Sequence, residues 1–493
     1  MDVGRVAEYF GIFHAPRNNT TTPPLQPTQD TGAMGGGAQA NIIVSPASEL
    51  GMCAPNDEII VVGGYTNTEL LAHTPAPCDD PARCGVHVLR QCGVTGRLTH
   101  LSTNAIGPNV AFIVRSPTNP SILYASTERI DDEGEIITLR MTPDFRLVEE
   151  TRIKAGGRST CYLNFNASRE WMMAVNYWDA RVSMFKLGKD GRPDIEAGRD
   201  PRWVLQQPGA DYVDRVKPTR EEHWKFRQRW PHSHCCVTEP YAGLVHFVVD
   251  LGLDKVFTYR VNSKTGVLVP KGSTRLPPGK GPRHLVFHPT VRSAYLVNEL
   301  DSTVSVFKVN IPEEWTTPHH WDAGASREDG CEEPGAVLEL TQCLSSLPES
   351  EQGKTTISPQ GIWKAASHSS EIRMHPNGRY FAVGNRGHDS IALYAVDQSD
   401  GTIALVDIVK SGGECPRNFN WTCGGKFLVV GNQNTNCMAT MSFDEASGAL
   451  KIVHEAGAGV TSPNYVYAIP ARELPSLISS ADGFGGALPA IAA

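Results

Sequence analysis

The strongest constraint on the fold is an internal repeat with a period of about 50 residues. Each copy has a short apolar run, a turn rich in Pro, Gly or Asn, and a second apolar run that mostly ends in Asn or Asp. A polar turn and a third, alternating run follow. Clear copies are TCYLNFNASREWMMAVNYWDARVSMFKL, GPRHLVFHPTVRSAYLVNELDSTVSVFKV and EIRMHPNGRYFAVGNRGHDSIALYAV. The copies begin near positions 111, 161, 234, 283, 370 and 417.

A seventh copy is divided between the two ends of the repeat region. SPNYVYAIP at 462–470 has no second half, and EIIVVGGYT at 58–66 supplies an unpaired strand near the start. Short strands with turn signals at this period are typical of propeller blades. We therefore predict an all-β, seven-bladed β-propeller whose ring is closed by strands from both termini. Two stacked β-sandwiches are the competing fold, but they do not explain a divided repeat.

The predicted propeller occupies residues 57–475. Two insertions lengthen the spacing, at 188–230 and 312–336, and lack strand periodicity, so both are expected to be surface loops. Residues 1–56 contain TTTPPLQPTQ and GAMGGGAQA, a composition that cannot bury a core, and we expect a disordered low-complexity tail. Residues 476–493 are expected to be a flexible C-terminal tail.

Charge and patterning exclude several classes of partner. The net charge of −8 argues against binding nucleic acid or an anionic membrane through a global positive field. No apolar run reaches the roughly 18 residues of a membrane helix, and the N-terminus lacks a signal-peptide pattern. We expect a cytoplasmic protein with no membrane or nucleic-acid partner. The 12 cysteines include no C-x-x-C pair, so reduced thiols and no metal are expected.

The repeat also predicts which side chains come together. In an antiparallel hairpin, the start of the first strand and the end of the second lie at the same end of the pair. The positions that open the first strands are Ala111, Cys161, His234, Arg283, Ser370, Arg417 and Asn464. The positions that follow the second strands are Glu128, Tyr177, Leu251, Glu299, Arg386 and Gln433. Both columns should meet at one mouth of the propeller's central channel.

These residue types suit an anion site with proton-transfer groups. Arginine binds carboxylate or phosphate in a bidentate manner, and histidine exchanges protons near neutral pH. Arg417, Glu128 and His232 are candidate substrate-binding residues. Simpler structural roles are also open: a salt bridge between Arg283 and Glu299, or histidines satisfied by the backbone. Arg386 could brace the loop that follows it, in the same way.

The motifs GPRHLVFHP, YLVNELDSTVSVF, PHSHCCVTEP and SSEIRMHPNGRYFAVGNRGHDSIALY resemble the seven-bladed propeller lactonase family. This family contains bacterial-type 6-phosphogluconolactonases and fungal carboxy-cis,cis-muconate cyclases, and the resemblance covers about residues 57–470. It implies a catalytic set without cofactor or metal, carried onto matching motifs here as His234, Arg283, Glu299 and Arg386. The sequence departs from the family at Cys235 and Cys236 and in the two insertions.

Three functions follow as hypotheses. The first is a lactonase that opens a small anionic sugar lactone, 6-phosphogluconolactone of the pentose phosphate pathway, with His234 and Glu299 sharing acid and base duties. The second is a muconate-type cycloisomerase that uses the same groups. The third is a non-catalytic propeller that binds a ligand or protein. The substrate and the oligomeric state are left open by the sequence.

Overall fold

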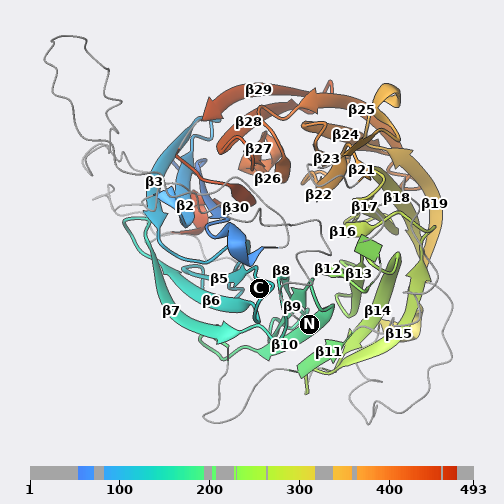
Figure 1. Cartoon of the computed structure of the whole chain (residues 1–493), viewed down its shortest axis with the longest axis horizontal. Coiled ribbons are helices and arrows are strands. Elements are labelled where there is room, and N and C mark those ends of the chain that lie inside the picture. Colours follow the sequence, from blue (N-terminus) through green and yellow to red (C-terminus); the bar gives the residue numbers. More distant parts are fainter. Residues whose placement is uncertain are drawn as a thin grey trace, which may run out of the picture.

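Seven four-stranded antiparallel sheets are arranged in a ring around a central axis (Figure 1). The structure is a computed structural model. It describes residues 54–71, 83–193, 203–206, 227–228, 230–262, 265–316, 337–357, 363–456 and 459–474. The fold is therefore the predicted all-β, seven-bladed propeller. The predicted tails, apart from residues 54–56, and most of both insertions lie outside the described residues.

We number the blades along the chain and give their strands from the axis outward. Blade 1 comprises β4 (Val110–Arg115), β5 (Ile122–Thr127), β6 (Glu135–Met141) and β7 (Leu147–Lys154). Blade 2 comprises β8 (Thr160–Phe165), β9 (Trp171–Asn176), β10 (Arg181–Lys186) and β11 (Trp203–Gln206). Blade 3 comprises β12 (Ser233–Thr238), β13 (Val245–Asp250), β14 (Lys255–Val261) and β15 (Leu268–Arg275). Blade 4 comprises β16 (Pro282–Phe287), β17 (Ser293–Asn298), β18 (Thr303–Val309) and β19 (Leu338–Ser345).

The remaining blades follow the same plan. Blade 5 comprises β22 (His368–Met374), β23 (Tyr380–Arg386), β24 (Ser390–Val396) and β25 (Ile403–Lys410). Blade 6 comprises β26 (Pro416–Thr422), β27 (Phe427–Asn432), β28 (Cys437–Asp444) and β29 (Ala449–Ala456). Blade 7 comprises β30 (Pro463–Pro470), β1 (Glu58–Gly64), β2 (Val86–Gln91) and β3 (Leu98–Asn104). A separate hairpin joins β20 (Thr355–Ile357) to β21 (Trp363–Ala365). Five 3-10 turns complete the described elements: Thr68–Leu70, Glu313–Trp315, Glu349–Glu351, Cys423–Gly425 and Ala471–Glu473.

Blade 7 closes the ring, as the divided repeat predicts. β30, the last strand in the sequence, is innermost and pairs antiparallel with β1, the first strand, from Glu58 opposite Pro470 to Gly64 opposite Pro463. Backbone hydrogen bonds therefore join the two ends of the propeller. Such closure leaves no exposed sheet edge between the first and last blades.

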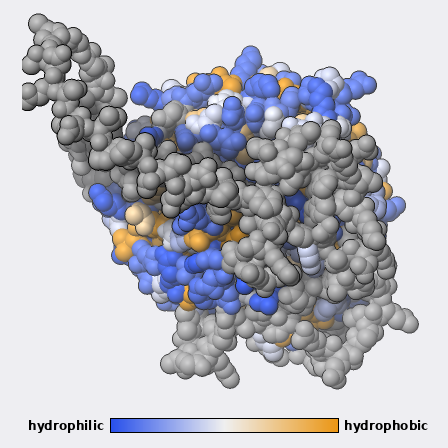
Figure 2. Space-filling model, in the orientation of Figure 1, coloured by the Kyte–Doolittle hydropathy of each residue, from blue (hydrophilic) through white to orange (hydrophobic). Residues whose placement is uncertain are grey.

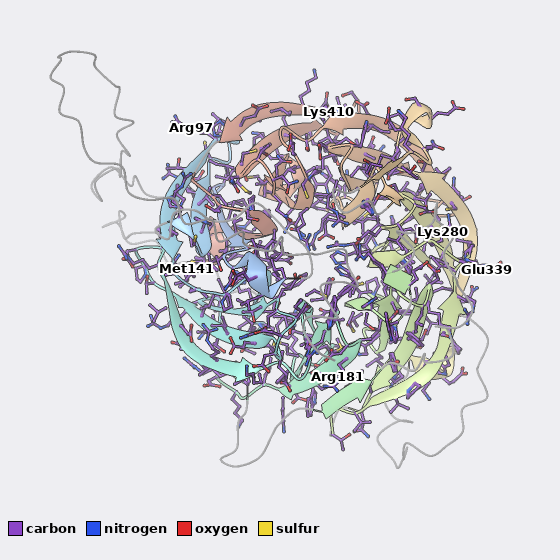
Figure 3. All side chains as sticks on the ribbon, viewed as in Figure 1. Arg97, Met141, Arg181, Lys280, Glu339 and Lys410 are labelled. Carbon is purple, nitrogen blue, oxygen red and sulfur yellow. The ribbon has the colours of Figure 1, made fainter. Side chains whose placement is uncertain are left out.

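The hydrophobic core lies in layers between neighbouring blades. Val248 and Phe257 of blade 3, for example, pack with Met173 of blade 2 in one layer, while Phe247 of blade 3 packs with Leu296 of blade 4 in the next. The second strands are buried along their whole length in most blades because both of their faces meet a neighbouring blade. Figure 3 shows side chains filling the spaces between blades, with Glu339 and Lys410 on the outer rim.

Two expectations about the chain need correction. The insertion at 188–230 is not wholly a surface loop, because Trp203–Gln206 within it forms β11, the outer strand of blade 2. The thiols are not all free, because Cys84 is disulfide-bonded. The other eight described cysteines are free.

The described surface gives no sign of a membrane span. Among the described residues, no helix has the length and apolar character needed to cross a bilayer. Most of the described surface visible in Figure 2 is hydrophilic, with small hydrophobic areas between.

Candidate active site

The innermost strand of every blade carries a β-bulge at the position that opens it. In blade 3, Ser233 pairs with Asp250 and Cys235 with Val249, so His234 has no partner across the ladder. The same shift leaves an unpaired residue in the other blades; with His234, the set is Ala111, Cys161, Arg283, the pair Ser370 and Glu371, Arg417 and Asn464. Bulges re-aim side chains and are common beside active sites. The predicted strand-opening column is thus a ring of bulged residues.

The second predicted column lies at the same end of the blades. The backbone N–H of Glu299 donates to the carbonyl of Gly281, two residues before Arg283, at 2.7 Å. The equivalent bonds in other blades join Glu128 to Asn109, Tyr177 to Ser159, Leu251 to His232 and Gln433 to Cys415, each at 2.9 Å. Arg386 pairs with His368 in the ladder of blade 5. The structure therefore brings the ends of the first and second strands together in each blade.

Glu299 is buried at the centre of three arginines. Its Oε2 lies 3.1 Å from Nε of Arg283 and 3.1 Å from Nη2 of Arg386. Its Oε1 contacts Arg227, whose other guanidinium nitrogen donates to the hydroxyl of Tyr177 at 2.6 Å. The side chain of Glu299 is only 2% exposed. The three arginines come from blade 4, blade 5 and the segment before blade 3, so folding assembles this cluster from distant parts of the chain.

The arginines decide the charge state of Glu299. Burial works against ionisation of the carboxyl group, but Arg227, Arg386 and Arg283 more than offset it and hold the pKa of Glu299 well below its usual range. Burial and repulsion from Arg386 lower the pKa of Arg283 to about 10, so it stays charged at neutral pH. Glu299 is therefore a fixed anion that positions the guanidinium groups.

His234 begins a chain of hydrogen bonds that leads through His284 to Glu371. Its Nδ1 lies 3.2 Å from Nε2 of His284, and Nδ1 of His284 lies 2.9 Å from Oε1 of Glu371. The other oxygen of Glu371 accepts from Asn418 and lies 3.3 Å from Nη2 of Arg373. Burial, with repulsion from Arg283 and His284, lowers the pKa of His234 well below its usual value. His234 is therefore neutral at physiological pH.

Arg417 and Glu128 lie on the other side of the same end of the ring. The guanidinium carbon of Arg417 is 5.0 Å from the centre of the Tyr65 ring, and the Tyr65 hydroxyl donates to Glu128 at 3.0 Å. No carboxylate among the described residues forms a salt bridge with Arg417. Its charge is thus available to a ligand.

His232 supports Tyr177, a neighbour of the arginine cluster. Its ring stacks on Tyr177 at 4.6 Å, and its Nδ1 lies 3.1 Å from the carbonyl oxygen of Tyr177. Burial lowers its pKa to about 4. Tyr177, in turn, contacts Arg227, so His232 reaches the arginine cluster through that tyrosine.

Among the described side chains, the charges of one local cluster do not balance. Four arginines (Arg227, Arg283, Arg386 and Arg417) accompany two carboxylates (Glu299 and Glu128) in this cluster, a local excess of two positive charges. Positive charge that is held in place without a protein counterion is suited to an anionic ligand. Among the described residues, no group of His, Cys, Asp and Glu is arranged to hold a metal ion.

The sequence matches the family described as lactonase, 7-bladed β-propeller, over residues 59–325 and 331–468. The chain belongs to this family. A 6-phosphogluconolactonase of Bacillus subtilis is 30% identical over 319 residues, which are 63% of this chain and 76% of that protein. An uncharacterized protein of Staphylococcus saprophyticus is 29% identical over 340 residues, 69% of this chain and 81% of its own length. The family and the Bacillus relative support a lactonase-type function.

Solved structures agree on the lactonase propeller fold. The periplasmic gluconolactonase of Pseudomonas aeruginosa superimposes with a TM-score of 0.64 at 24% identity, covering 84% of this chain and 99% of that one. A protein from Lactobacillus plantarum gives a TM-score of 0.65 at 22% identity, with 84% and 99% covered. At this identity the likeness shows the fold alone. Because the Pseudomonas protein is periplasmic, a cytoplasmic location for this lactonase stays a prediction.

The repeat pattern does not predict three residues of the candidate site. His284 follows Arg283 directly, and because Arg283 is a bulge residue, both side chains turn to the same neighbours. Glu371 shares a two-residue bulge with Ser370, and the predicted column names Ser370, one position before Glu371. Arg227 belongs to EEHWKFRQRW, a segment outside the repeat, and its only signal was the dense charge just before PHSH.

Proposed function

We propose that this lactonase hydrolyses a small anionic sugar lactone, with 6-phosphogluconolactone of the pentose phosphate pathway as its substrate. The observation that carries the proposal is the excess of two positive charges beside a neutral, buried imidazole. The arginines match a phosphate and a developing oxyanion, and His234 matches the proton transfers of ester hydrolysis. The name of the Bacillus relative agrees with this substrate.

In the proposed mechanism, His234 takes a proton from water while the water oxygen attacks the lactone carbonyl carbon. The carbonyl π electrons move to oxygen, and Arg283 and Arg386 stabilise the oxyanion that forms. The intermediate collapses by breaking the bond to the ring oxygen, which receives the proton from His234. The immediate products are the carboxylic acid and the free hydroxyl group; the acid then releases its proton to solvent and becomes the carboxylate, so atoms and charge balance.

The remaining residues divide between binding and support. Arg417 takes the phosphate, and Glu128 fixes Tyr65 beneath it. His232 holds Tyr177 against Arg227. Glu299 anchors the arginines instead of sharing acid and base duties, because its pKa is held too low for it to carry a proton near neutral pH.

The test is a coupled assay of freshly generated 6-phosphogluconolactone with 6-phosphogluconate dehydrogenase, with spontaneous opening subtracted. Wild type should show a rate above the blank, and Arg283→Ala should lose about 10²- to 10³-fold in kcat, as for removal of an oxyanion donor. The Arg283→Lys variant, which keeps a positive charge at this position, checks that the loss in Arg283→Ala is not caused by a folding defect. Arg292→Ala is the control, since Arg292 is exposed at the opposite end of the same hairpin.

Three results would count against the proposal. No wild-type rate above the blank, together with turnover of carboxymuconate, would replace the hydrolase with a cycloisomerase. No rate with either compound would favour a non-catalytic binding propeller. Equal rates for Arg283→Ala and wild type would remove Arg283 from the site.

A further inference from the structure

We propose that His284 and Glu371 form a buried relay that fixes the tautomer and orientation of His234, and that both are positioning residues for the reaction. The kinetic part of this inference rests on the proposed lactone hydrolysis. The structural part does not, because it concerns a chain of hydrogen bonds that exists without a substrate.

The relay is built from four blades. His234 lies on β12 of blade 3, His284 on β16 of blade 4, and Glu371 on β22 of blade 5. Asn418 of blade 6 donates to Glu371, and Arg373 pairs with the same carboxylate oxygen. The backbone N–H of Ile372 donates to the other oxygen at 3.0 Å. Each carboxylate oxygen of Glu371 is therefore held, and the direction in which it accepts from His284 is fixed.

The direction of each hydrogen bond follows from the charge state of Glu371. Burial opposes its ionisation, but Arg373 and His284 offset this and lower the pKa of Glu371 to about 2. An ionised carboxylate only accepts, so Nδ1 of His284 carries the proton. Burial lowers the pKa of His284 to about 4, so the ring is neutral and its Nε2 is an acceptor. His234 must then donate from Nδ1, which leaves the lone pair on its Nε2.

This assignment makes His234 a base in the orientation that the reaction needs. Its Nδ1 is occupied by His284, so Nε2 is the nitrogen left for water or the leaving oxygen. When Nε2 takes a proton, the charge on the ring is stabilised through Nδ1–H, His284 and the Glu371 carboxylate. Without the relay, either nitrogen could carry the proton, and half of the possible tautomers would present N–H where a lone pair is required.

Other charged and titratable groups also surround His234. They come from blades 2, 3 and 4 and from the end of β17: Cys161, Tyr177, Cys235, Arg283 and Glu299. Arg283 lies 3.3 Å and 3.4 Å from the two ring nitrogens of His284, which places it over the ring, and it donates to the carbonyl of Ser370 at 2.5 Å. Sγ of Cys161 lies 3.9 Å from Nδ1 of His234, but it is closer to the carbonyl oxygen of His234, at 3.3 Å, to which its S–H donates. His284, at 3.2 Å, is the shorter contact of Nδ1. The tautomer is thus set by His284.

The experiment combines NMR of ¹⁵N-labelled histidine with kinetics in Glu371→Gln and His284→Asn. The matched controls are Glu239→Gln and His288→Asn. Glu239 and His288 are equally buried, but they bond to turns at the opposite end of the blades from His234. In wild type, the His234 signals should show a proton on Nδ1 and a free Nε2. Both relay variants should lose that pattern, and kcat should fall about 10²- to 10⁴-fold while KM changes little. The controls should keep the tautomer and kcat.

The two readouts separate the relay from the proposed function. A wild type that shows the Nδ1–H tautomer, lost in both variants, supports the relay even if no lactone is hydrolysed. Unchanged His234 signals in both variants would overturn it even if wild type is an active lactonase. A fall in kcat without a change of tautomer would also overturn it, because that result indicates a general structural defect.

Discussion

Three guanidinium groups meet at Glu299, and the close approach of these like charges is tolerated because the buried carboxylate lies between them. A buried ion pair contributes little net stability, but removal of one partner leaves the others unpaired. At the scale of single residues, the main role of Glu299 is thus to offset the mutual repulsion of Arg227, Arg283 and Arg386. Loss of its charge should affect stability and activity together.

We therefore expect Glu299→Gln to lower the free energy of unfolding by about 3 to 5 kcal/mol at neutral pH. The folded-state pKa of Glu299 is depressed, so its contribution is complete above the ordinary carboxyl pKa of about 4.3 and is lost as pH falls towards the folded value. The difference between wild type and variant should be equal at pH 8 and pH 6 and smaller below about pH 4. Denaturant unfolding at these pH values measures it.

The control for this series is Glu339→Gln, on the exposed outer strand of blade 4, which should stay within about 0.5 kcal/mol of wild type. A difference at Glu299 that grows towards acid pH would contradict the assignment, since it would mean that the carboxyl group is protonated in the folded protein.

At the scale of strands, the bulge of each innermost strand depends on the loop that enters it. Gly281 illustrates this dependence in blade 4. Its φ is +59°, its carbonyl accepts from the backbone of Glu299, and its N–H donates to Asp254 at 2.7 Å. A Cβ at this position would overlap the side chain of Leu300. The glycine thus sets the path of the chain into Arg283.

Gly281→Ala should lower the free energy of unfolding by more than about 1 kcal/mol and reduce kcat, because backbone strain and the clash with Leu300 both displace Arg283. Gly353→Ala is the matched control: its φ is +68°, but nothing lies within 4 Å of the added Cβ. The control variant measures the strain of a positive φ alone. Thermal unfolding gives the stability of each variant, and the lactone assay gives its kcat. Equal losses for the two variants would show that the Leu300 contact plays no part.

The geometry of the strands also explains which site residues the sequence predicts and which it misses. The hairpin periodicity locates His234, Arg283 and Arg417 because a bulge recurs at the same place in each blade. It misses Glu371 because blade 5 has two residues in its bulge. It also misses Arg227 and β11, which reach the blades from a non-repeating segment whose contacts depend on tertiary packing. Seven blades follow from periodicity; these contacts do not.

At the scale of the whole molecule, the ring is held by the pairing of β30 with β1. Loss of β30 would expose the inner edge of β1 and remove apolar side chains such as Val466 and Ile469 from the core. It would also remove Asn464 from the ring of bulged residues.

A chain that ends at residue 462 should therefore fail to unfold as one cooperative unit and should have no lactonase activity. A chain that ends at residue 474 retains every described strand and serves as the control, with activity and a melting temperature close to those of the full chain. Thermal unfolding followed by circular dichroism makes the comparison. Full activity in the shorter chain would show that β30 is dispensable for closure.

The position of β30 also has a consequence during protein synthesis. It is the last described strand to leave the ribosome, yet within blade 7 it is the strand nearest the propeller axis. Six blades can be made before it emerges, yet the ring that aligns His234, Arg283 and Arg417 is complete only afterwards. A nascent chain that lacks β30, or a chain clipped before it, should therefore be inactive, and the fold makes catalysis depend on the addition of this one strand.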